Sequence, residues 1–228
     1  MRYLHPVAVS ERFIAKGVYL DYEGDTLLPG RESWTRHALA GGGILTRIDS
    51  EGIGSSVLAE ILADETGHVE RLHVREWNTD AQSAYHTLRA DYIFFPDYVQ
   101  ISRRKDDAET DHAETYFSPL TTIINLPFCL YVSVKFKRMA DDLNTNFSFL
   151  IPTWRGAKDD LVDIFENVPR PDGGPFADVS HLTPRYTKTP TIIYYATLGR
   201  YLGVDEHNIP LQCQDGDEIT LLTEYAHI

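Results

Sequence analysis

The stretch that most constrains the fold is residues 84–104, AYHTLRADYIFFPDYVQISRR, in which apolar and polar side chains alternate. The even-numbered side chains from His86 to Phe94 form a mostly apolar face, and the odd-numbered ones form a mostly polar face. Side chains alternate with this period only in a β-strand. The stretch therefore predicts a long strand that is buried on one face.

Residues 95–98, FPDY, predict the turn that ends this strand. Pro96 fixes φ near about −65°, which excludes the primed two-residue hairpin turns and favours a four-residue loop. The apolar side chains of the two strands then lie opposite each other on the buried face. The predicted pairs are Phe94 with Val99, Tyr92 with Ile101, and Ala90 with Arg103.

The rest of the chain predicts further strands joined mostly by hairpins. They are expected at residues 13–22, 34–48, 55–62, 68–77, 128–138, 147–154, 191–201, 209–214 and 218–226. Gly67 and the pair Asp215-Gly216 mark two of the hairpin turns. A meander of this many strands forms an antiparallel sheet wide enough to curl. We therefore expect a mainly β fold in one domain, residues 1–228, with a single curled sheet that forms a half-barrel or a calycin-like barrel.

A glycine triplet, residues 41–43, interrupts the alternation of residues 34–48, in which Trp34 and Ile48 share a face opposite His37 and Arg47. Such a triplet resembles a phosphate-binding loop, but the further glycine spacing, lysine and helix of that motif are missing. A bulge or a sharp bend of the curled sheet is the interpretation that the sequence favours.

Two segments predict non-strand structure. Residues 157–168 place apolar side chains at helical spacing, with two aspartates in the first turn, and predict one amphipathic helix. Residues 116–126 predict a short apolar lid that is helical or irregular, because Pro127 ends any helix there. Residues 169–190 hold many prolines and glycines and predict a long loop.

The composition excludes several partners. The formal net charge of −13 disfavours nucleic acid and an anionic membrane surface, since both require clustered cations. The first 30 residues contain no apolar run of a secretory signal, and no stretch is long and apolar enough to span a membrane. The sequence therefore predicts a cytoplasmic protein, and it leaves an oligomer possible.

No motif for a cofactor, a metal or a nucleophile stands out. The nucleophile elbow, the zinc motif HExxH and the Walker motif are missing. The pairs His68 with Glu70 and His112 with Glu114 supply too few ligands for a stable metal site. Cys129 has apolar neighbours, which raise the pKa of a thiol and make it unreactive. We expect no metal and no cofactor.

The candidate site lies on the apolar face of the curled sheet. An imidazole there, at His86, serves as a general base or a hydrogen-bonding anchor. Arg103 adds a fixed cation, and we expect both to be catalytic if the protein is an enzyme. The ligand-binding residues that we predict are Trp34, His86, Tyr92, Phe94, Ile101 and Arg103. The alternative is an ordinary core, in which His86 is a satisfied buried residue and the Arg103 side chain reaches out to water at the strand end.

Residues 194–225, YYATLGRYLGVDEHNIPLQCQDGDEITLLTEY, have a strand, an acidic turn, a strand that starts at Pro210-Leu211 and a final strand. This segment resembles the C-terminal strands of the lipoprotein-carrier-like half-barrels, a fold shared with the violacein-pathway enzyme. Resemblance to the carriers implies transport of an acyl chain, and resemblance to the enzyme implies cofactor-free chemistry on an aromatic intermediate. Calycin barrels are the competing fold.

Two functions follow from this reading. The first is a module that binds a hydrophobic small molecule, aromatic or acyl, on the concave apolar face of the sheet. The second is a cofactor-independent biosynthetic enzyme, a cyclase, isomerase or dehydratase, that uses the same hollow with His86 as acid or base. Both require an interior that leaves room for a guest.

Overall fold

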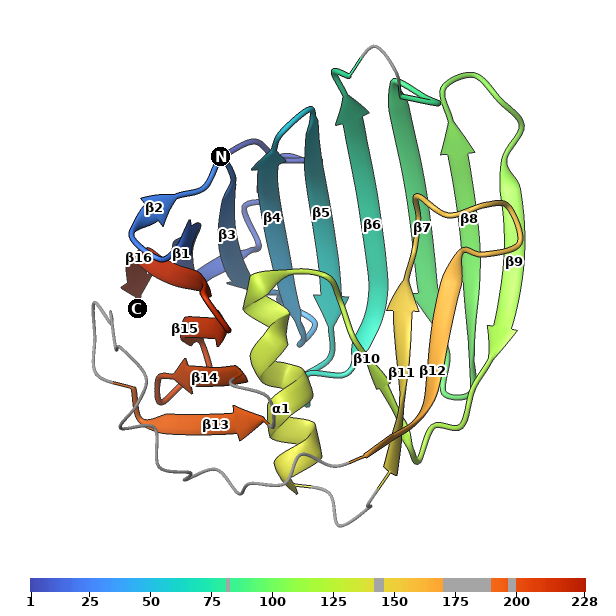
Figure 1. Cartoon of the computed structure of the whole chain (residues 1–228). Helices are drawn as coiled ribbons and strands as arrows, with labels where there is room; N and C mark the ends of the chain where they lie inside the picture. Colours follow the sequence, from blue (N-terminus) through green and yellow to red (C-terminus); the bar gives the residue numbers. More distant parts are fainter. Residues whose placement is uncertain (81–82, 142–145, 170–189, 197–199) are drawn as a thin grey trace.

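The computed structural model describes residues 1–80, 83–141, 146–169, 190–196 and 200–228 (Figure 1). Its main element is a 13-stranded antiparallel sheet with the order β13-β14-β15-β16-β1-β3-β4-β5-β6-β7-β8-β9, in which the short β2 pairs with β1. The path ends at β9 and β13, so the sheet curls without closing into a barrel. The prediction of a mainly β protein with one curled antiparallel sheet is confirmed.

The strands of this sheet follow the chain order with few exceptions. They are β1 (Arg12–Glu23), β2 (Thr26–Leu27), β3 (Arg31–Ala38), β4 (Ile44–Gly52), β5 (Ser55–Ala63), β6 (Val69–Asn78), β7 (Thr87–Phe94), β8 (Tyr98–Lys105), β9 (Asp111–Tyr116), β13 (Ile192–Ala196), β14 (Arg200–Val204), β15 (Pro210–Asp215) and β16 (Glu218–His227). The C-terminal strand β16 pairs with β1, which brings the two ends of the chain into one sheet.

A second unit, which we call the cover, packs against the concave face of the large sheet (Figure 1). It consists of β10 (Thr122–Ile124), the 3₁₀ turn η1 (Cys129–Tyr131), α1 (Val132–Asp141), β11 (Asn146–Pro152) and β12 (Val162–Pro169). Its three strands form a separate sheet in which β10 is parallel and β12 antiparallel to β11. The cover is therefore joined to the large sheet by side chains rather than by a strand ladder.

The hairpin of β7 and β8 has the register that its sequence predicts. Phe94 lies opposite Val99, Tyr92 opposite Ile101 and Ala90 opposite Arg103. The Phe95 N–H donates to the Tyr98 carbonyl at 2.8 Å and closes the loop that contains Pro96. The turn residue and the alternation together fix the register, since a slip of one residue would turn every apolar side chain to the other face.

The glycine triplet connects two strands rather than bending one. Gly42 and Gly43 have φ values of +86° and +80° in the turn between β3 and β4. These values suit glycine, because a side chain there would be strained. The expected bulge within a strand is therefore wrong, while the predicted division of the two faces, with Trp34 and Ile48 opposite His37 and Arg47, follows the observed register.

Further secondary-structure predictions are wrong. The single strand expected at residues 191–201 covers β13 and the start of β14, which pair antiparallel, and two more errors fall in the cover. Residues 157–168 were expected to be helical, but most of this segment is β12, which pairs with β11. Residues 128–138 were expected to form a strand, but they form η1 and most of α1, the one α-helix among the described residues. In both cases contacts with distant parts of the chain outweigh a weak local pattern.

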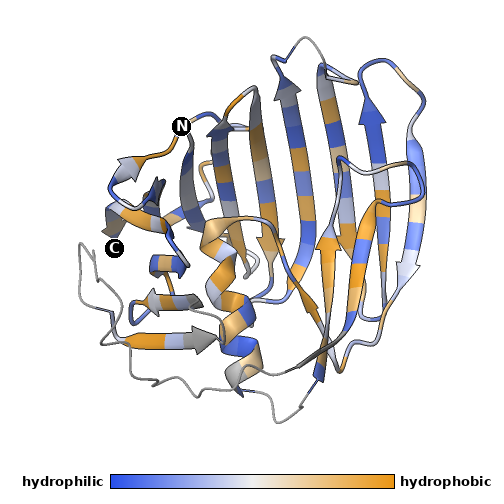
Figure 2. Cartoon of the chain, viewed as in Figure 1, coloured by the Kyte–Doolittle hydropathy of each residue, from blue (hydrophilic) through white to orange (hydrophobic). Residues whose placement is uncertain are grey.

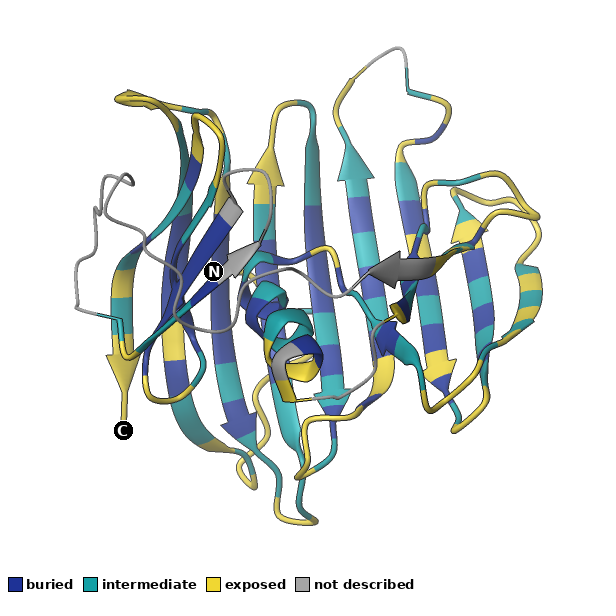
Figure 3. Cartoon of the chain, turned by 60° about the horizontal axis from the view of Figure 1, so that its bottom comes forward, coloured by how far each residue is buried: buried dark blue, intermediate teal, exposed yellow. Residues whose placement is uncertain are grey.

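The large sheet is buried on its concave face and partly solvated on its outer face. Bands of hydrophobic and hydrophilic residues alternate along β5 to β8 (Figure 2), and bands of buried and more exposed residues follow the same pattern (Figure 3). One cluster of buried side chains unites strands of the sheet with Leu126, Leu130 and Leu150 of the cover region. Of the predicted loop at 169–190, residues 170–189 lie outside the described residues.

Candidate functional site

The concave face carries most of the side chains that the sequence predicts for the site. Tyr92, Phe94 and Ile101 lie together on β7 and β8 and are between 0% and 6% exposed. Trp34 is also buried on this face, but four strand spacings separate β3 from β7. At about 4.8 Å per strand this distance is about 19 Å. The structure therefore brings three of the predicted residues into one place and leaves Trp34 at another.

Trp34 belongs to an aromatic group near the ends of the chain. Its ring stacks on Tyr19 at a centroid distance of 6.3 Å and lies at the same distance from Tyr225. A Cβ atom at Gly17 would lie 2.7 Å from the Trp34 ring, so this close packing requires glycine. The indole nitrogen of Trp34 is buried without a hydrogen-bond partner among the described residues.

The hollow that the sequence predicts on this face is filled by the cover. The Tyr92 hydroxyl donates to the Leu161 carbonyl at 2.8 Å, and Phe128 stacks on Trp154 at 6.1 Å. Burial raises the pKa of Tyr92 above its usual range, so the phenol stays a donor. The buried cover side chains of this region are Leu126, Phe128, Leu130, Tyr131, Leu150, Trp154 and Leu161. In this conformation the expectation of open room at these residues is wrong, because the chain supplies its own apolar contacts.

His86 lies outside the covered region, which contradicts its predicted position on the buried face. It is exposed and precedes β7, which begins at Thr87. Its backbone N–H donates to the Asp106 carboxylate at 3.1 Å, and its carbonyl accepts from Asn78. The alternation breaks before β7, because the adjacent Tyr85 is the buried residue, 8% exposed, and its hydroxyl donates to Glu76. His86 cannot be the acid or base of a covered hollow.

Arg103 is buried, yet its guanidinium is not available as a free cation. It forms an ion pair with Asp111 and donates to the carbonyls of Trp154 and Gly156. With 3% exposure it does not reach out to water, so the alternative of a solvent-reaching side chain is wrong. Its observed role is to hold the segment between β11 and β12 against the large sheet.

Two buried glutamates on the concave face were missed by the sequence reasoning. Glu76, 1% exposed, accepts from the Trp154 indole N–H at 3.1 Å and from the Arg155 guanidinium at 3.0 Å. Glu32 accepts from the backbone N–H groups of Cys129 and Leu130 at the start of η1. Each glutamate therefore holds one part of the cover.

The protonation of Glu32 differs from that of an ordinary carboxyl group. Burial raises its pKa to about 7, against the opposing effect of the two backbone N–H donors. Burial also raises the pKa of Cys129 well above its usual range, and the neighbouring Glu32 and Asp21 carboxylates add to that shift. The direction for Cys129 agrees with the predicted unreactive thiol.

The sequence contains a signal that would have located both glutamates. Glu32 precedes Trp34 by two residues, and Glu76 follows Val74 by two residues, so each shares the face of a buried apolar neighbour. A carboxylate on an apolar strand face needs a donor above it. Such a position predicts a covering segment, which is what η1 and the Trp154 turn provide.

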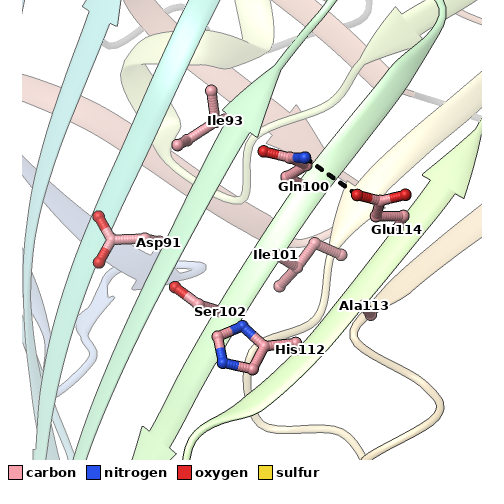
Figure 4. A pocket seen from close by; sticks show the side chains of 8 residues that line it. All are labelled: Asp91, Ile93, Gln100, Ile101, Ser102, His112, Ala113 and Glu114. Carbon is pink, nitrogen blue, oxygen red and sulfur yellow. Dashed lines mark hydrogen bonds between the residues drawn. The ribbon is translucent and has the colours of Figure 1, made fainter.

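A shallow hollow of about 530 Å³ lies on the outer face of β7, β8 and β9 (Figure 4). The residues that line it are Asp91, Ile93, Gln100, Ile101, Ser102, His112, Ala113 and Glu114. Asp91 Oδ1 accepts from His73 at 2.7 Å and from Arg71 at 2.8 Å. The pKa of Asp91 is lowered, because these hydrogen bonds outweigh the effect of its partial burial.

In the described part of the chain, no group of three or more histidine, cysteine or acidic side chains is arranged to hold a metal ion. No described helix has the length and apolar character needed to cross a bilayer. Neither Cys129 nor Cys213 is part of a disulfide.

Comparison with known proteins gives a fold likeness only. No protein-family model matches the chain, and no curated protein matches it. One solved structure is similar, the crystal structure of a β-barrel-like protein of a domain of unknown function, DUF1849, from Brucella abortus. It shares 12% identity at a TM-score of 0.44, over 97% of this chain and 99% of that chain. A likeness this distant assigns no function.

Proposed function

We propose that the protein binds a hydrophobic small molecule on the concave face of the large sheet, in the place that the cover occupies. The observation that carries this proposal is the way the cover is attached. Its strands lie in a separate sheet. Apolar side chains hold it in place, together with hydrogen bonds in which Glu32 accepts from its backbone N–H groups and Tyr92 and Arg103 donate to its carbonyls.

A cover that is attached in this way can separate from the large sheet without breaking any described strand pairing of that sheet. The large sheet keeps its own strand ladder when the cover leaves, because no described strand of the sheet pairs with a strand of the cover. The apolar concave face cannot remain open in water, since burial of apolar surface contributes about 25 cal/mol per Å². A hydrophobic guest that replaces the cover side chains would offset the cost of opening.

The polar groups under the cover define the chemistry of the guest. Most of the face near β7 and β8 is apolar, with the Tyr92 hydroxyl as a donor among Phe94, Val99 and Ile101. Once the Leu161 carbonyl has moved away, this hydroxyl can donate to one polar group of the guest. The Arg103 guanidinium on the same face also loses its carbonyl acceptors in the cover. An acyl or aromatic molecule with an acceptor group near these donors fits this arrangement.

The test is a titration with the fluorescent probe N-phenyl-1-naphthylamine. We expect saturable binding, which strengthens several-fold in Tyr92→Phe, because that variant keeps the ring and loses the bond to Leu161. Tyr98→Phe is the matched control on the outer face and is expected to bind like the parent protein. If neither the parent nor Tyr92→Phe binds the probe at micromolar concentration, the proposal fails.

Native mass spectrometry of protein purified from its own host identifies the guest. We expect a co-purified hydrophobic molecule that is released when the protein unfolds. Its amount should fall when the probe is added in excess, because both occupy the same face. A molecule that stays bound in the presence of saturating probe would place its site elsewhere.

A further inference from the structure

The outer face of β8 and β9 presents three successive pairs of side chains. Tyr98 lies opposite Tyr116, Gln100 opposite Glu114 and Ser102 opposite His112. Because side chains on one strand face repeat every second residue, the three pairs form one strip. The strip is about 14 Å long, and the hollow beside β7 lies along its two polar pairs.

The polar groups of this strip have unused hydrogen-bonding capacity. The Ser102 hydroxyl and the His112 imidazole have no hydrogen-bond partner among the described residues (Figure 4). Gln100 donates from its amide to Glu114 Oε1 at 2.9 Å, which leaves its own carbonyl oxygen and the Glu114 Oε2 atom to accept. Donors and acceptors are therefore mixed within one hollow.

The hollow holds two carboxylates, and a neighbouring cation offsets the charge of one of them. Asp91 is paired with Arg71 and bonded to His73, whereas Glu114 accepts from the neutral Gln100 amide and keeps its charge. None of the side chains that line the hollow is a lysine or an arginine. The hollow therefore lacks the cations that bind phosphate or sulfate, and its one uncompensated carboxylate is exposed, where it attracts a cationic ligand only weakly.

An exposed aromatic stack continues the strip at one end. Phe95 stacks on Tyr98 at a centroid distance of 4.4 Å, and Tyr98 stacks on Tyr116 at 5.5 Å. Tyr116 is 68% exposed, and it is the outermost ring, on the edge strand of the sheet. Ile93, 40% exposed, adds an apolar patch to the hollow itself.

We propose that this strip binds a neutral saccharide. Sugar hydroxyls both donate and accept, as Ser102, His112 and Gln100 can, and vicinal diols match the two oxygens of a carboxylate. The C–H faces of a pyranose ring pack on the electron-rich face of an aromatic ring, which Tyr116 offers. The strip has the length of a di- or trisaccharide. The inference concerns the outer face and does not depend on the function proposed for the concave face.

The test is a nuclear magnetic resonance titration with four neutral hexasaccharides: cellohexaose, chitohexaose, maltohexaose and mannohexaose. Because the hollow is shallow, we expect at least one to bind with a Kd of roughly 0.1–1 mM. The shifted amides should belong to β7, β8 and β9. Binding should weaken at least about tenfold in Tyr116→Ala and in the double variant Ser102→Ala/His112→Ala.

Phe165→Ala is the matched control, because Phe165 is another exposed aromatic residue, 52% exposed, on β12 in the cover. It should bind the saccharide like the parent protein, and thermal melts should show that every variant is folded. The proposal is overturned if no hexasaccharide shifts these amides at millimolar concentration or if Tyr116→Ala binds unchanged. It is also overturned if a lysine-rich peptide binds the hollow more tightly and is released by salt.

Discussion

Arg103 and Arg104 are neighbours on β8, and they show how differently the two faces of the sheet are used. The Arg103 side chain is 3% exposed and is bonded to Asp111 and to carbonyls of the cover region. The Arg104 side chain is 49% exposed and makes local contacts, an ion pair with Asp107 and a hydrogen bond to the Asp106 carbonyl. One residue step along a strand thus separates a buried structural cation from a solvated one.

The same contrast holds for the segments that lie on each face. On the outer face, the N-terminal residues are held by charged pairs, Arg2 with Asp49 at 2.6 Å and Glu11 with Arg47 at 2.6 Å. On the concave face, buried polar side chains bond mainly to the backbone of the cover, as Glu32 does at η1. Apolar contacts therefore bury the concave face, while its polar groups fix where the cover lies.

The largest expected effect comes from removing the buried cation. Arg103→Met should lower the free energy of unfolding by about 3–5 kcal/mol, because the Asp111 carboxylate and two buried carbonyls lose their donor. Arg104→Met, one residue away, should change it by less than about 1 kcal/mol. Urea denaturation of both variants measures the difference. Equal losses would mean that the two arginines are not distinguished by burial.

Glu32 on the concave face and Glu11 on the outer face should make the stability of the protein depend on pH in opposite directions. The pKa of Glu32 is raised to about 7, so the folded state holds a proton there that the unfolded state releases near pH 4.5. Stability from this group is full below pH 4.5 and is lost as pH rises to about 7. The loss is of the order of 3 kcal/mol, at about 1.4 kcal/mol per pKa unit.

Glu11 should behave in the opposite way. Hydrogen bonds from Arg47 lower its pKa to about 2, so its contribution is full above pH 4.5 and is lost as pH falls toward 2. Urea denaturation of Glu32→Gln and Glu11→Gln between pH 3 and 8 distinguishes the two contributions to stability. Both carboxyl groups have an ordinary pKa of 4.5, so one contribution changes above this pH and the other below it. If Glu32→Gln keeps the full decline of stability between pH 4.5 and 7, the raised pKa of Glu32 is wrong.

The smallest expected effect belongs to His86. His86→Ala should change the free energy of unfolding by less than about 0.5 kcal/mol, since the side chain is exposed and its backbone bonds to Asp106 remain. Probe binding should also stay unchanged. A loss of probe binding in His86→Ala would place this residue at the site and would contradict the structure.

The sequence predicts the large sheet well because strand alternation and turn chemistry are local. The register of β7 and β8 follows from Pro96 and from the period of two. Gly67 has a φ of +86° and Gly216 a φ of +62°, as their predicted hairpin turns require. Buried Tyr92 and Ile101 were found for the same reason.

The cover could not be predicted in this way, because its elements are chosen by distant partners. Val132 and Phe136 of α1 pack against the buried cluster of Tyr194, Leu202 and Val204 on the C-terminal strands. Alternating residues of segment 128–138 fit a strand equally well until those partners are known. For Arg103 the alternation gives the correct face but not what lies above it. For His86 it fails because the strand begins at Thr87 and Tyr85 is the buried residue before it.

The central claim is that the cover can leave the concave face while the large sheet stays folded. Native-state hydrogen exchange in low denaturant tests it most directly, by comparing amides of β11 and β12 with those of β5 and β6. The account predicts that the cover amides exchange through an opening of lower free energy, and that bound hydrophobic probe shifts this opening. Exchange of both groups only by global unfolding, with or without the probe, would contradict it.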